Sequence, residues 1–244
     1  MRILLVSDIH SNLAALDAVI KDAGHFDGIW CLGDIVGYGP QPNECIERLR
    51  TFDLVCLAGN HDLAVVDKQS LDDFSPDARE AAFWTRDRLA AVHCRWLETL
   101  PGIAVVAKYD MTLVHASPRD PVWEYISSST IAERCFQSIS TSVCLYGHTH
   151  VPAIFRKPTY EVGIVTERLS VNTPVSLTLD RLLVNPGSVG QPRDEDVRAA
   201  YAIVDLDAMT LTYHRVQYDI SATQRLMQQA RLPDRLRRRL RFGE

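Results

Sequence analysis

The chain has 244 residues, of which 46% are hydrophobic and 23% are charged. This balance is typical of a folded globular protein and excludes a disordered chain and an integral membrane protein. The 26 basic and 31 acidic residues give a formal net charge of −5, which argues against a protein that wraps nucleic acid over much of its surface. The length fits one large domain with a sizeable core.

The cysteines and the N-terminal sequence favour a cytoplasmic protein that makes no membrane contact. The apolar run at 3–6 is too short for a signal peptide, and no stretch approaches the roughly 20 apolar residues that cross a bilayer. The cysteines have no C-x-x-C spacing and most lie in apolar runs, so we expect reduced core residues. They are Cys31, Cys45, Cys56, Cys94, Cys135 and Cys144.

Short apolar runs separated by polar loops open the chain. Runs rich in Ile, Val and Leu predict strands, and helices are predicted after Asn12 and near Pro42. This order is typical of a βαβαβ unit with a parallel sheet. A longer helical stretch from Ser75 to Trp96 fits one helix or two. The predicted strands are 3–6, 29–32 and 54–57.

The second half of the chain is dominated by strands at close spacing, which predict a second, largely antiparallel sheet. Two sheets that face each other, with helices outside them, fit this order better than a Rossmann unit, because helices do not alternate with these strands. The segment 158–180 is a polar, β-prone insertion without an assigned function. The predicted strands are 103–107, 112–115, 143–146, 152–155, 181–184, 200–204 and 211–214.

The last 25 residues differ in composition from the rest. A helix is predicted from Ile220, followed by an arginine-rich tail, so we divide the chain into a domain at 1–219 and a C-terminal segment at 220–244. Such an arginine run is most often a solvated helix face or a frayed end, and contact with nucleic acid or a partner is the alternative. The arginines are Arg225, Arg231, Arg235, Arg237, Arg238, Arg239 and Arg241.

Side chains that bind metals follow successive predicted strands, at the sheet edge where α/β proteins bind ligands. In an extended loop, the Asp-x-His and His-x-His patterns would direct both side chains of each pair the same way. Mixed imidazole and carboxylate ligands suit zinc, manganese, iron or nickel better than calcium. The residues are Asp8, His10, Asp34, Asn60, His61, Asp62, His115, His148 and His150.

These blocks, in this order, resemble the calcineurin-like metallophosphoesterase superfamily over residues 1–205. The segments 33–44 and 185–193 are similar to small, single-domain phosphodiesterases of bacteria and archaea. The resemblance implies an α/β fold, a four-layer αββα sandwich with two facing mixed β-sheets. It also implies a centre of two divalent metal ions between the sheet edges, with manganese favoured over zinc, iron or nickel.

The same resemblance implies a role for each motif residue. Asp34 would bridge the two ions, and His61 would face the substrate and, when protonated, stabilise the transition state or protonate the leaving group. The two ions would lower the pKa of a shared water, so that a metal-bridging hydroxide attacks phosphorus directly. The remaining ligands would be Asp8, His10 and His150 for the first ion, and Asn60, His115 and His148 for the second.

The sequence departs from two subclasses of the superfamily. Protein phosphatases and symmetrical dinucleoside tetraphosphate hydrolases have a phosphate-binding arginine after the second block, where this chain has Gly37 and Tyr38. We therefore predict phosphodiesters as substrates, since a diester carries one negative charge and a monoester dianion needs more compensation. Arg193 is a candidate for the missing phosphate contact, and Tyr38 a candidate for stacking on the substrate.

Three alternatives stay open at this stage. One is a nucleotide or dinucleoside polyphosphate hydrolase, or a phosphomonoesterase, which shares the same centre. Another is a non-catalytic metal-binding scaffold with this fold, which the intact ligand set and His61 argue against. The third is a nuclease that uses the arginine-rich tail. The expected partner is a small phosphoester or nucleotide, nucleic acid is a weaker candidate, and the sequence predicts no oligomeric state.

Overall fold

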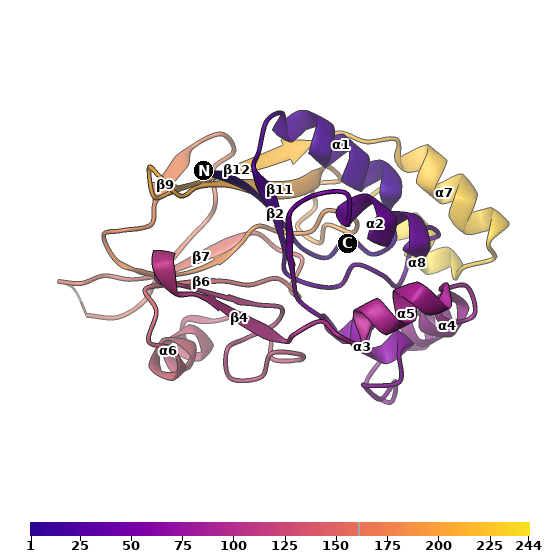
Figure 1. Cartoon of the computed structure of the whole chain (residues 1–244), viewed down its shortest axis with the longest axis horizontal. Coiled ribbons are helices and arrows are strands. Elements are labelled where there is room, and N and C mark those ends of the chain that lie inside the picture. The colour runs from indigo at the N-terminus through magenta and orange to yellow at the C-terminus, as the bar shows by residue number, and fades with distance from the viewer. Residues whose placement is uncertain (161) are drawn as a thin grey trace.

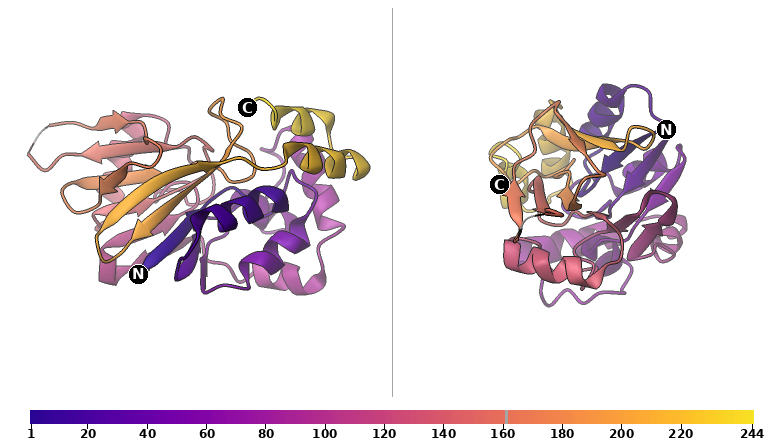
Figure 2. Two further views of the ribbon diagram at one scale, coloured as in Figure 1. Left: turned by 90° about the horizontal axis from the view of Figure 1, so that it is seen from above. Right: turned by 90° about the vertical axis from the view of Figure 1, so that its left-hand side faces the viewer.

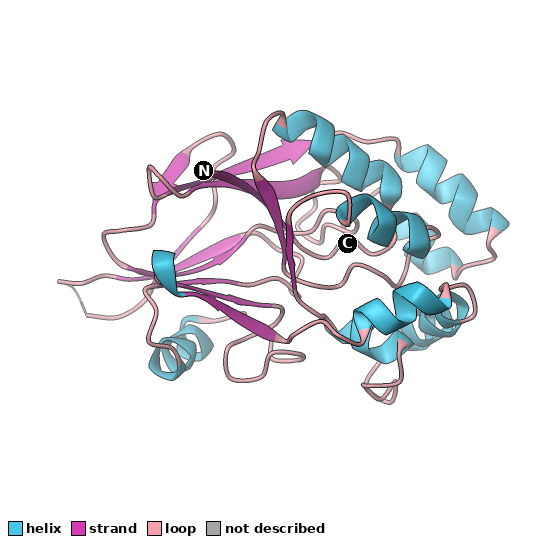
Figure 3. Cartoon of the chain, in the orientation of Figure 1, coloured by secondary structure: helices cyan, strands magenta, loops and turns pink. Residues whose placement is uncertain are grey.

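A computed structural model describes residues 1–160 and 162–244. Two six-stranded sheets face each other, and helices cover their outer faces (Figure 1). The same layers are visible from two further directions in Figure 2. This is the predicted four-layer αββα sandwich. Most of the helices gather at one end of the molecule, on the right of Figure 3.

The first sheet combines the N-terminal strands with strands from the end of the domain. Its order is β3-β2-β1-β11-β12-β9, with β1, β2 and β3 parallel and the other pairs antiparallel. The strands are β1 (Arg2–Val6), β2 (Gly28–Cys31), β3 (Leu54–Cys56), β9 (Pro174–Ser176), β11 (Ala199–Asp205) and β12 (Thr210–Val216).

Two strands lie in a different sheet from the predicted one. The expected second sheet included 200–204 and 211–214, but β11 pairs with β1 and extends the first sheet. All but the last residue of β11 are buried, which suits a strand in the middle of a sheet with both faces covered. Apolar patterning predicts burial of a strand and does not specify its neighbour.

The second sheet has the order β4-β5-β6-β10-β7-β8. The strands β5, β6 and β10 run parallel, and the other three pairs are antiparallel, so this sheet is mixed like the first. The strands are β4 (Ile103–Val106), β5 (Met111–Val114), β6 (Val143–Leu145), β7 (Ala153–Lys157), β8 (Val165–Glu167) and β10 (Arg181–Asn185).

Alternate residues of each strand face different cores. In β1, Ile3 and Leu5 lie between the sheets, while Leu4 and Val6 pack against the helices outside the first sheet. Those helices include α1 (Leu13–Ala23) and α2 (Pro42–Leu49), both close to the predicted positions. The outer face of the second sheet packs against α6 (Ser129–Ser138), a helix that the sequence did not predict.

The region 60–109 is mainly helical. The predicted stretch from Ser75 consists of two helices, α4 (Pro76–Arg86) and α5 (Ala91–Leu97), and a short 3₁₀ turn η1 (Ala107–Tyr109) follows β4. The sequence did not predict α3 (Asn60–Val65), which begins at a candidate metal ligand. Among helices of the described residues, none has the length and apolar character needed to cross a membrane.

The insertion at 158–180 contributes one edge strand to each sheet, β8 to the second and β9 to the first. Within the described residues, the segment predicted to be β-prone thus carries these two short strands.

The C-terminal segment folds back onto the domain. It forms α7 (Ile220–Gln229) and α8 (Asp234–Arg239), and Leu236 and Leu240 are buried in a cluster with Tyr38 and Phe74. The end of the chain is therefore not frayed at α8, because the four-residue spacing of Leu232, Leu236 and Leu240 gives this region an apolar face. Arg235 and Arg238 are exposed, so part of the helix surface is solvated, as the sequence interpretation expected. The division into 1–219 and 220–244 stays a prediction.

Candidate metal centre

The predicted ligands meet where the carboxyl ends of strands from both sheets converge. Asp8 and His10 follow β1, Asp34 follows β2 and Asn60 follows β3 in the first sheet. In the second sheet, His115 follows β5, and His148 and His150 follow β6. All seven side chains are buried, and none is more than 3% exposed.

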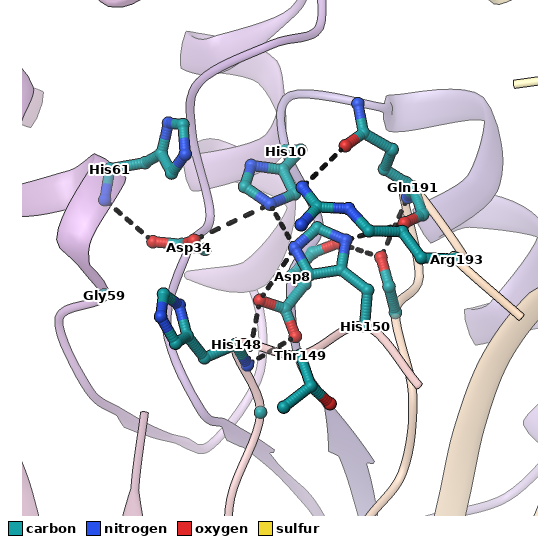
Figure 4. A network of polar contacts seen from close by, with 12 residues as sticks. Asp8, His10, Asp34, Gly59, His61, His148, Thr149, His150, Gln191 and Arg193 are labelled. Carbon is teal, nitrogen blue, oxygen red and sulfur yellow. Dashed lines mark hydrogen bonds and ion pairs between the residues drawn. The ribbon is translucent and has the colours of Figure 1, made fainter. Parts of the chain in front are cut away.

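A first group of ligand atoms is formed by Asp8, His10, Asp34 and His150, whose donor atoms lie within 4.8 Å of one another. The Nε2 atoms of His10 and His150 are 3.1 Å apart, and Nε2 of His150 is 3.5 Å from Oδ1 of Asp8. Figure 4 shows these side chains converging on one space. The group matches the predicted first site.

A second group contains Asp34, His115 and His148. Asn60 adds an amide oxygen, with its Oδ1 3.2 Å from Nε2 of His115. Asp34 links the two groups through one atom, because its Oδ2 lies 3.6 Å from Nε2 of His10 and 3.5 Å from Nε2 of His115. Asp34 thus lies where the predicted bridging carboxylate would be needed.

Backbone carbonyls orient the imidazole rings. The Nδ1 atoms of His10, His115 and His150 lie within hydrogen-bond distance of carbonyl oxygens, so each is the N–H donor and Nε2 keeps its lone pair for a cation. His148 has the opposite arrangement, because its Nε2 donates to the carbonyl of Trp123 at 3.2 Å and Nδ1 is left for a metal. The other three acceptors are Val36 (3.1 Å), Leu32 (2.9 Å) and Gln191 (2.6 Å).

The electrostatics of this donor set fit a divalent cation. Burial and the charge of Asp34 raise the pKa of the Asp8 carboxyl to about 7, and burial raises the pKa of Asp34 well above its usual range. Burial also lowers the pKa of His10, His148 and His150 well below the usual range. Without a cation, the site disfavours carboxylates and imidazolium alike, whereas a cation binds carboxylates and neutral imidazoles.

The ligand loops are left-handed, in contrast to the extended loops predicted for the Asp-x-His and His-x-His patterns. Asp8, His10, Asp34, His148 and His150 have φ between 49° and 64°. Non-glycine residues rarely adopt this conformation, and strain of this kind concentrates at functional sites. The left-handed residues turn the backbone around the centre, so the two side chains of each pair point toward the same site.

One glycine permits the close approach of α3 to the bridging carboxylate. An added Cβ at Gly59 would lie 2.1 Å from Oδ1 of Asp34. In the protein, this oxygen accepts a hydrogen bond of 2.9 Å from the backbone N–H of His61. Gly59 thus positions Asp34 and the N-terminal end of α3 together.

We expect Gly59→Ala to displace Asp34, lower the metal content and destabilise the fold by about 1–3 kcal/mol through overpacking. Gly102→Ala is the control, because its added methyl would meet only Pro121, at 3.6 Å. Thermal unfolding and metal analysis of both variants check this prediction. Normal metal content in Gly59→Ala would contradict the packing argument.

The segment 185–193 holds the ligand loops in place, a role that sequence reasoning missed. Asn185 donates to the carbonyl of Gly147 at 2.6 Å and to Thr149 Oγ1 at 3.0 Å. Ser188 donates to the carbonyl of Asp8 at 2.7 Å. Both residues follow the predicted strand 181–184. Polar residues directly after a predicted strand are candidate site residues, so the same reasoning could have found these two.

His61 lies beside the centre and contributes to neither group. Its ring packs 4.3 Å from the ring of Tyr38 and 4.8 Å from that of Phe74. Its Nδ1 is buried without a hydrogen-bond partner among the described residues. Burial and the charge of Arg193 lower the pKa of His61 well below its usual range.

Asp62 holds two loops of the centre together and makes no hydrogen bond to the His61 ring. Its carboxylate accepts from the backbone N–H groups of Val36 at 3.1 Å and Gly59 at 3.0 Å. It thereby holds the loop after β2 against the start of α3, which is an orienting role of the kind expected for a residue outside the ligand set.

A cavity of about 370 Å³ opens over the centre. Asp34, Asn60, His61 and His148 form part of its floor, and Arg193 and Tyr38 line it as well. The guanidinium of Arg193 lies 5.8 Å from the ring centre of Tyr38 and donates to Gln191 Oε1 at 3.0 Å. Sequence reasoning did not assign the other polar lining residues, which are Asp73, Ser75, Asp77, Arg235 and Arg239.

Two aromatic residues of the loop after β5 border the same cavity. Tyr125 is 45% exposed and stacks on the ring of His148 at 4.1 Å, so one face of its ring is open to a ligand. Trp123 packs edge-on against Phe74 at 5.2 Å, and its main contribution is the carbonyl that orients His148.

Comparison with known proteins agrees with this geometry. A crystal structure of a metallophosphoesterase from Sphaerobacter thermophilus has 46% identity and a TM-score of 0.91, covering 100% of this chain and 99% of that one. An uncharacterised protein of Methanocaldococcus jannaschii is 36% identical over 99% of this chain and 98% of its own length. A symmetrical bis(5'-nucleosyl)-tetraphosphatase of Aliivibrio salmonicida is 28% identical over 53% of this chain and 47% of its own length.

The family model described as calcineurin-like phosphoesterase superfamily domain matches residues 1–209. This range contains every residue of the two ligand groups and all strands of the two sheets except β12. The chain therefore belongs to the calcineurin-like phosphoesterase superfamily.

Proposed function

We propose that this chain is a two-metal phosphodiesterase that hydrolyses its substrate by direct attack of water, without a protein nucleophile. The observation that carries the proposal is the position of Asp34 Oδ2 between His10 and His115, which joins two buried ligand groups at the base of one cavity. The metal ligands would be Asp8, His10, Asp34, Asn60, His115, His148 and His150.

Two divalent ions, with manganese favoured, would activate the attacking water and neutralise phosphoryl charge when bound. The chain's own contribution is to hold the ligands in one orientation. The carbonyls of Val36, Leu32 and Gln191 fix three imidazoles, and Asp62 and Ser188 fix the loops that carry the carboxylates. Because these contacts exist before substrate binds, little reorganisation is needed during the reaction.

His61 and Arg193 are the two cavity residues that we assign to the phosphoryl group. His61 would donate from Nε2 to a phosphoryl or leaving-group oxygen, and its neutral form supplies this hydrogen bond. Arg193 would bind a non-bridging oxygen, because it lines the cavity and its side-chain hydrogen bonds within the described residues go to the neutral groups of Gln191 and Tyr38.

The choice of a diester rests on the surroundings of Tyr38. Its ring lies 4.5 Å from that of His10 and 4.3 Å from that of His61, and so it fills the space beside the centre with an aromatic surface. A monoester dianion beside this ring has two negative charges, and Arg193 would be the guanidinium that compensates them. A diester has one negative charge to compensate, and its second organic group could pack on the ring.

With manganese present, we expect kcat/KM for bis(p-nitrophenyl) phosphate to exceed that for p-nitrophenyl phosphate. The variant Tyr38→Arg should reduce the difference in kcat/KM between the two substrates. Since Tyr38 is buried, Arg193→Gln serves as a second variant, and it should lower kcat/KM for both substrates about 10-fold or more. A wild-type preference of 10-fold for the monoester, about 1.4 kcal/mol, would overturn the diester assignment.

A second candidate is hydrolysis of dinucleoside polyphosphates, in which the attacked phosphorus is also doubly substituted. Two observations favour it. Arg235 and Arg239 line the cavity in addition to Arg193, and the exposed ring of Tyr125 could stack on a base. The sequence similarity to symmetrical tetraphosphatases over 53% of the chain agrees with this candidate.

We also place the enzyme in the cytoplasm, which the six free cysteines support.

A further inference from the structure

Three arginines from two separate segments line the cavity above the metal centre. Arg193 comes from the loop after β10, and Arg235 and Arg239 come from α8. The four-residue spacing of Arg235 and Arg239 places them one turn apart on the same face of the helix. This face adjoins the apolar one that carries Leu236 and Leu240, so the packing of α8 determines where both guanidiniums lie.

Three other arginines of the C-terminal segment are paired with carboxylate side chains. Arg225 pairs with Asp219, and Arg237 and Arg238 both pair with Asp234. No ion pair of 4 Å or less joins Arg193, Arg235 or Arg239 to an Asp or Glu side chain within residues 1–160 and 162–244. Arg239 has one anionic neighbour, because its Nε donates to the main-chain oxygen of Glu244 and the charge of Glu244 lies close to its guanidinium. Nε of Arg193 is buried without a hydrogen-bond partner among the described residues.

The grouping of like charges is unfavourable unless an anion binds. Burial and the charges of Arg193 and Arg235 lower the pKa of Arg239 to about 10, so it remains charged at neutral pH. Asp73 and Asp77 also line the cavity and reduce its positive charge. Asp34, the third carboxylate of the lining, belongs to the metal centre, so three guanidiniums stand against two carboxylates in the rest of the lining, as a site for an anionic group would require.

The C-terminal helix is firmly attached to the domain. Leu236 and Leu240 are 2% and 5% exposed. Gln224 of α7 donates to the carbonyl of Arg237 at 2.7 Å, and the backbone N–H of Glu195 donates to the carbonyl of Gly243 at 3.0 Å. The second bond joins the end of the chain to the loop that carries Arg193. Arg235 and Arg239 therefore lie on a helix that is packed against the rest of the protein.

We propose that Arg235 and Arg239 form a second phosphate subsite, which binds a phosphate group of the substrate beyond the one that is hydrolysed. This proposal rests on the proposed function, because the centre and Arg193 define where the hydrolysed phosphate lies. The substrate class is then a phosphoester or phosphoanhydride with at least one further phosphate, such as a dinucleoside polyphosphate. Guanidiniums suit this task because each offers two parallel N–H donors to phosphate oxygens.

The test is a binding measurement that requires no turnover. Diadenosine tetraphosphate with methylene groups in place of the bridging oxygens is titrated calorimetrically into the full-length, manganese-loaded protein. We expect the double variant Arg235→Gln/Arg239→Gln to bind about 100-fold more weakly than wild type, about 10-fold for each guanidinium removed. Arg238→Gln is the control for each single change, because it removes one positive charge from the same helix at a position paired with Asp234, and it should bind normally.

Hydrolysis of bis(p-nitrophenyl) phosphate by the same samples separates the two proposals. This diester has no further phosphate, so the double variant should hydrolyse it within about threefold of wild type if α8 only binds the second group. Unchanged binding of the analogue by the double variant, an equal loss in Arg238→Gln, or an equal loss on the simple diester would each overturn the subsite. A wild-type protein that binds the analogue through these arginines and hydrolyses no phosphoester would instead overturn the proposed function alone.

Discussion

Replacing Asp34 by asparagine should abolish most of the activity and release at least one metal ion. Its Oδ2 atom lies within 3.6 Å of one imidazole from each ligand group, so both ions would depend on this one carboxylate. An amide keeps the shape and loses the negative charge that offsets repulsion between two divalent cations. A loss of several kcal/mol at the transition state corresponds to about a 1,000-fold lower kcat/KM.

The measurement is metal content per chain together with kcat/KM on bis(p-nitrophenyl) phosphate. Asp22→Asn is a suitable control, because Asp22 accepts a 2.7 Å hydrogen bond from Tyr201 outside the centre. That variant should keep its metal and its activity even where stability falls. Two ions per chain and normal turnover in Asp34→Asn would refute the bridging role.

The second large effect is expected for His61→Ala, which should keep both metals and lose about 10²–10⁴ in kcat. His61 belongs to neither ligand group, and it lines the cavity over the centre. Its loss should therefore act on the transition state and leave the cations in place. Metal analysis and steady-state kinetics on one preparation distinguish these effects.

His93→Ala provides the control for removal of a buried imidazole. His93 is 4% exposed and lies within 3.1 Å of Glu47, in a part of the fold that does not line the cavity. It should keep full metal content and a normal kcat. Since the ring of His61 also packs on Tyr38 and Phe74, His61→Gln is a second variant that preserves more of this contact. Loss of metal in both His61 variants would identify His61 as a ligand.

The ligand set could be predicted from the sequence because it obeys a local rule. Each ligand follows a strand that is recognisable from its apolar residues, and the carboxyl ends of parallel strands meet at one edge. Asp8 and Asp34 follow two neighbouring parallel strands, and His115 and His148 follow two others. The structure brings all seven residues together, whereas their roles in binding metal stay a prediction that the experiments above address.

Other features depend on long-range packing and could not be predicted in this way. The apolar pattern of β11 indicated a buried strand, but its partner β1 lies almost 200 residues earlier in the chain. The left-handed conformation of His10 and His150 has no marker in residue type, because it is imposed by the surrounding loops. Composition alone indicated a solvated arginine tail, although Arg235 and Arg239 line the cavity.

The most direct test of the account is anomalous diffraction from crystals of the full chain grown with manganese. The account predicts two peaks per chain, one among Asp8, His10, Asp34 and His150, and the other among Asp34, Asn60, His115 and His148, with Asp34 in contact with both. A single peak would contradict a two-metal centre and with it the proposed hydrolysis, and two peaks that do not share Asp34 would contradict its bridging role.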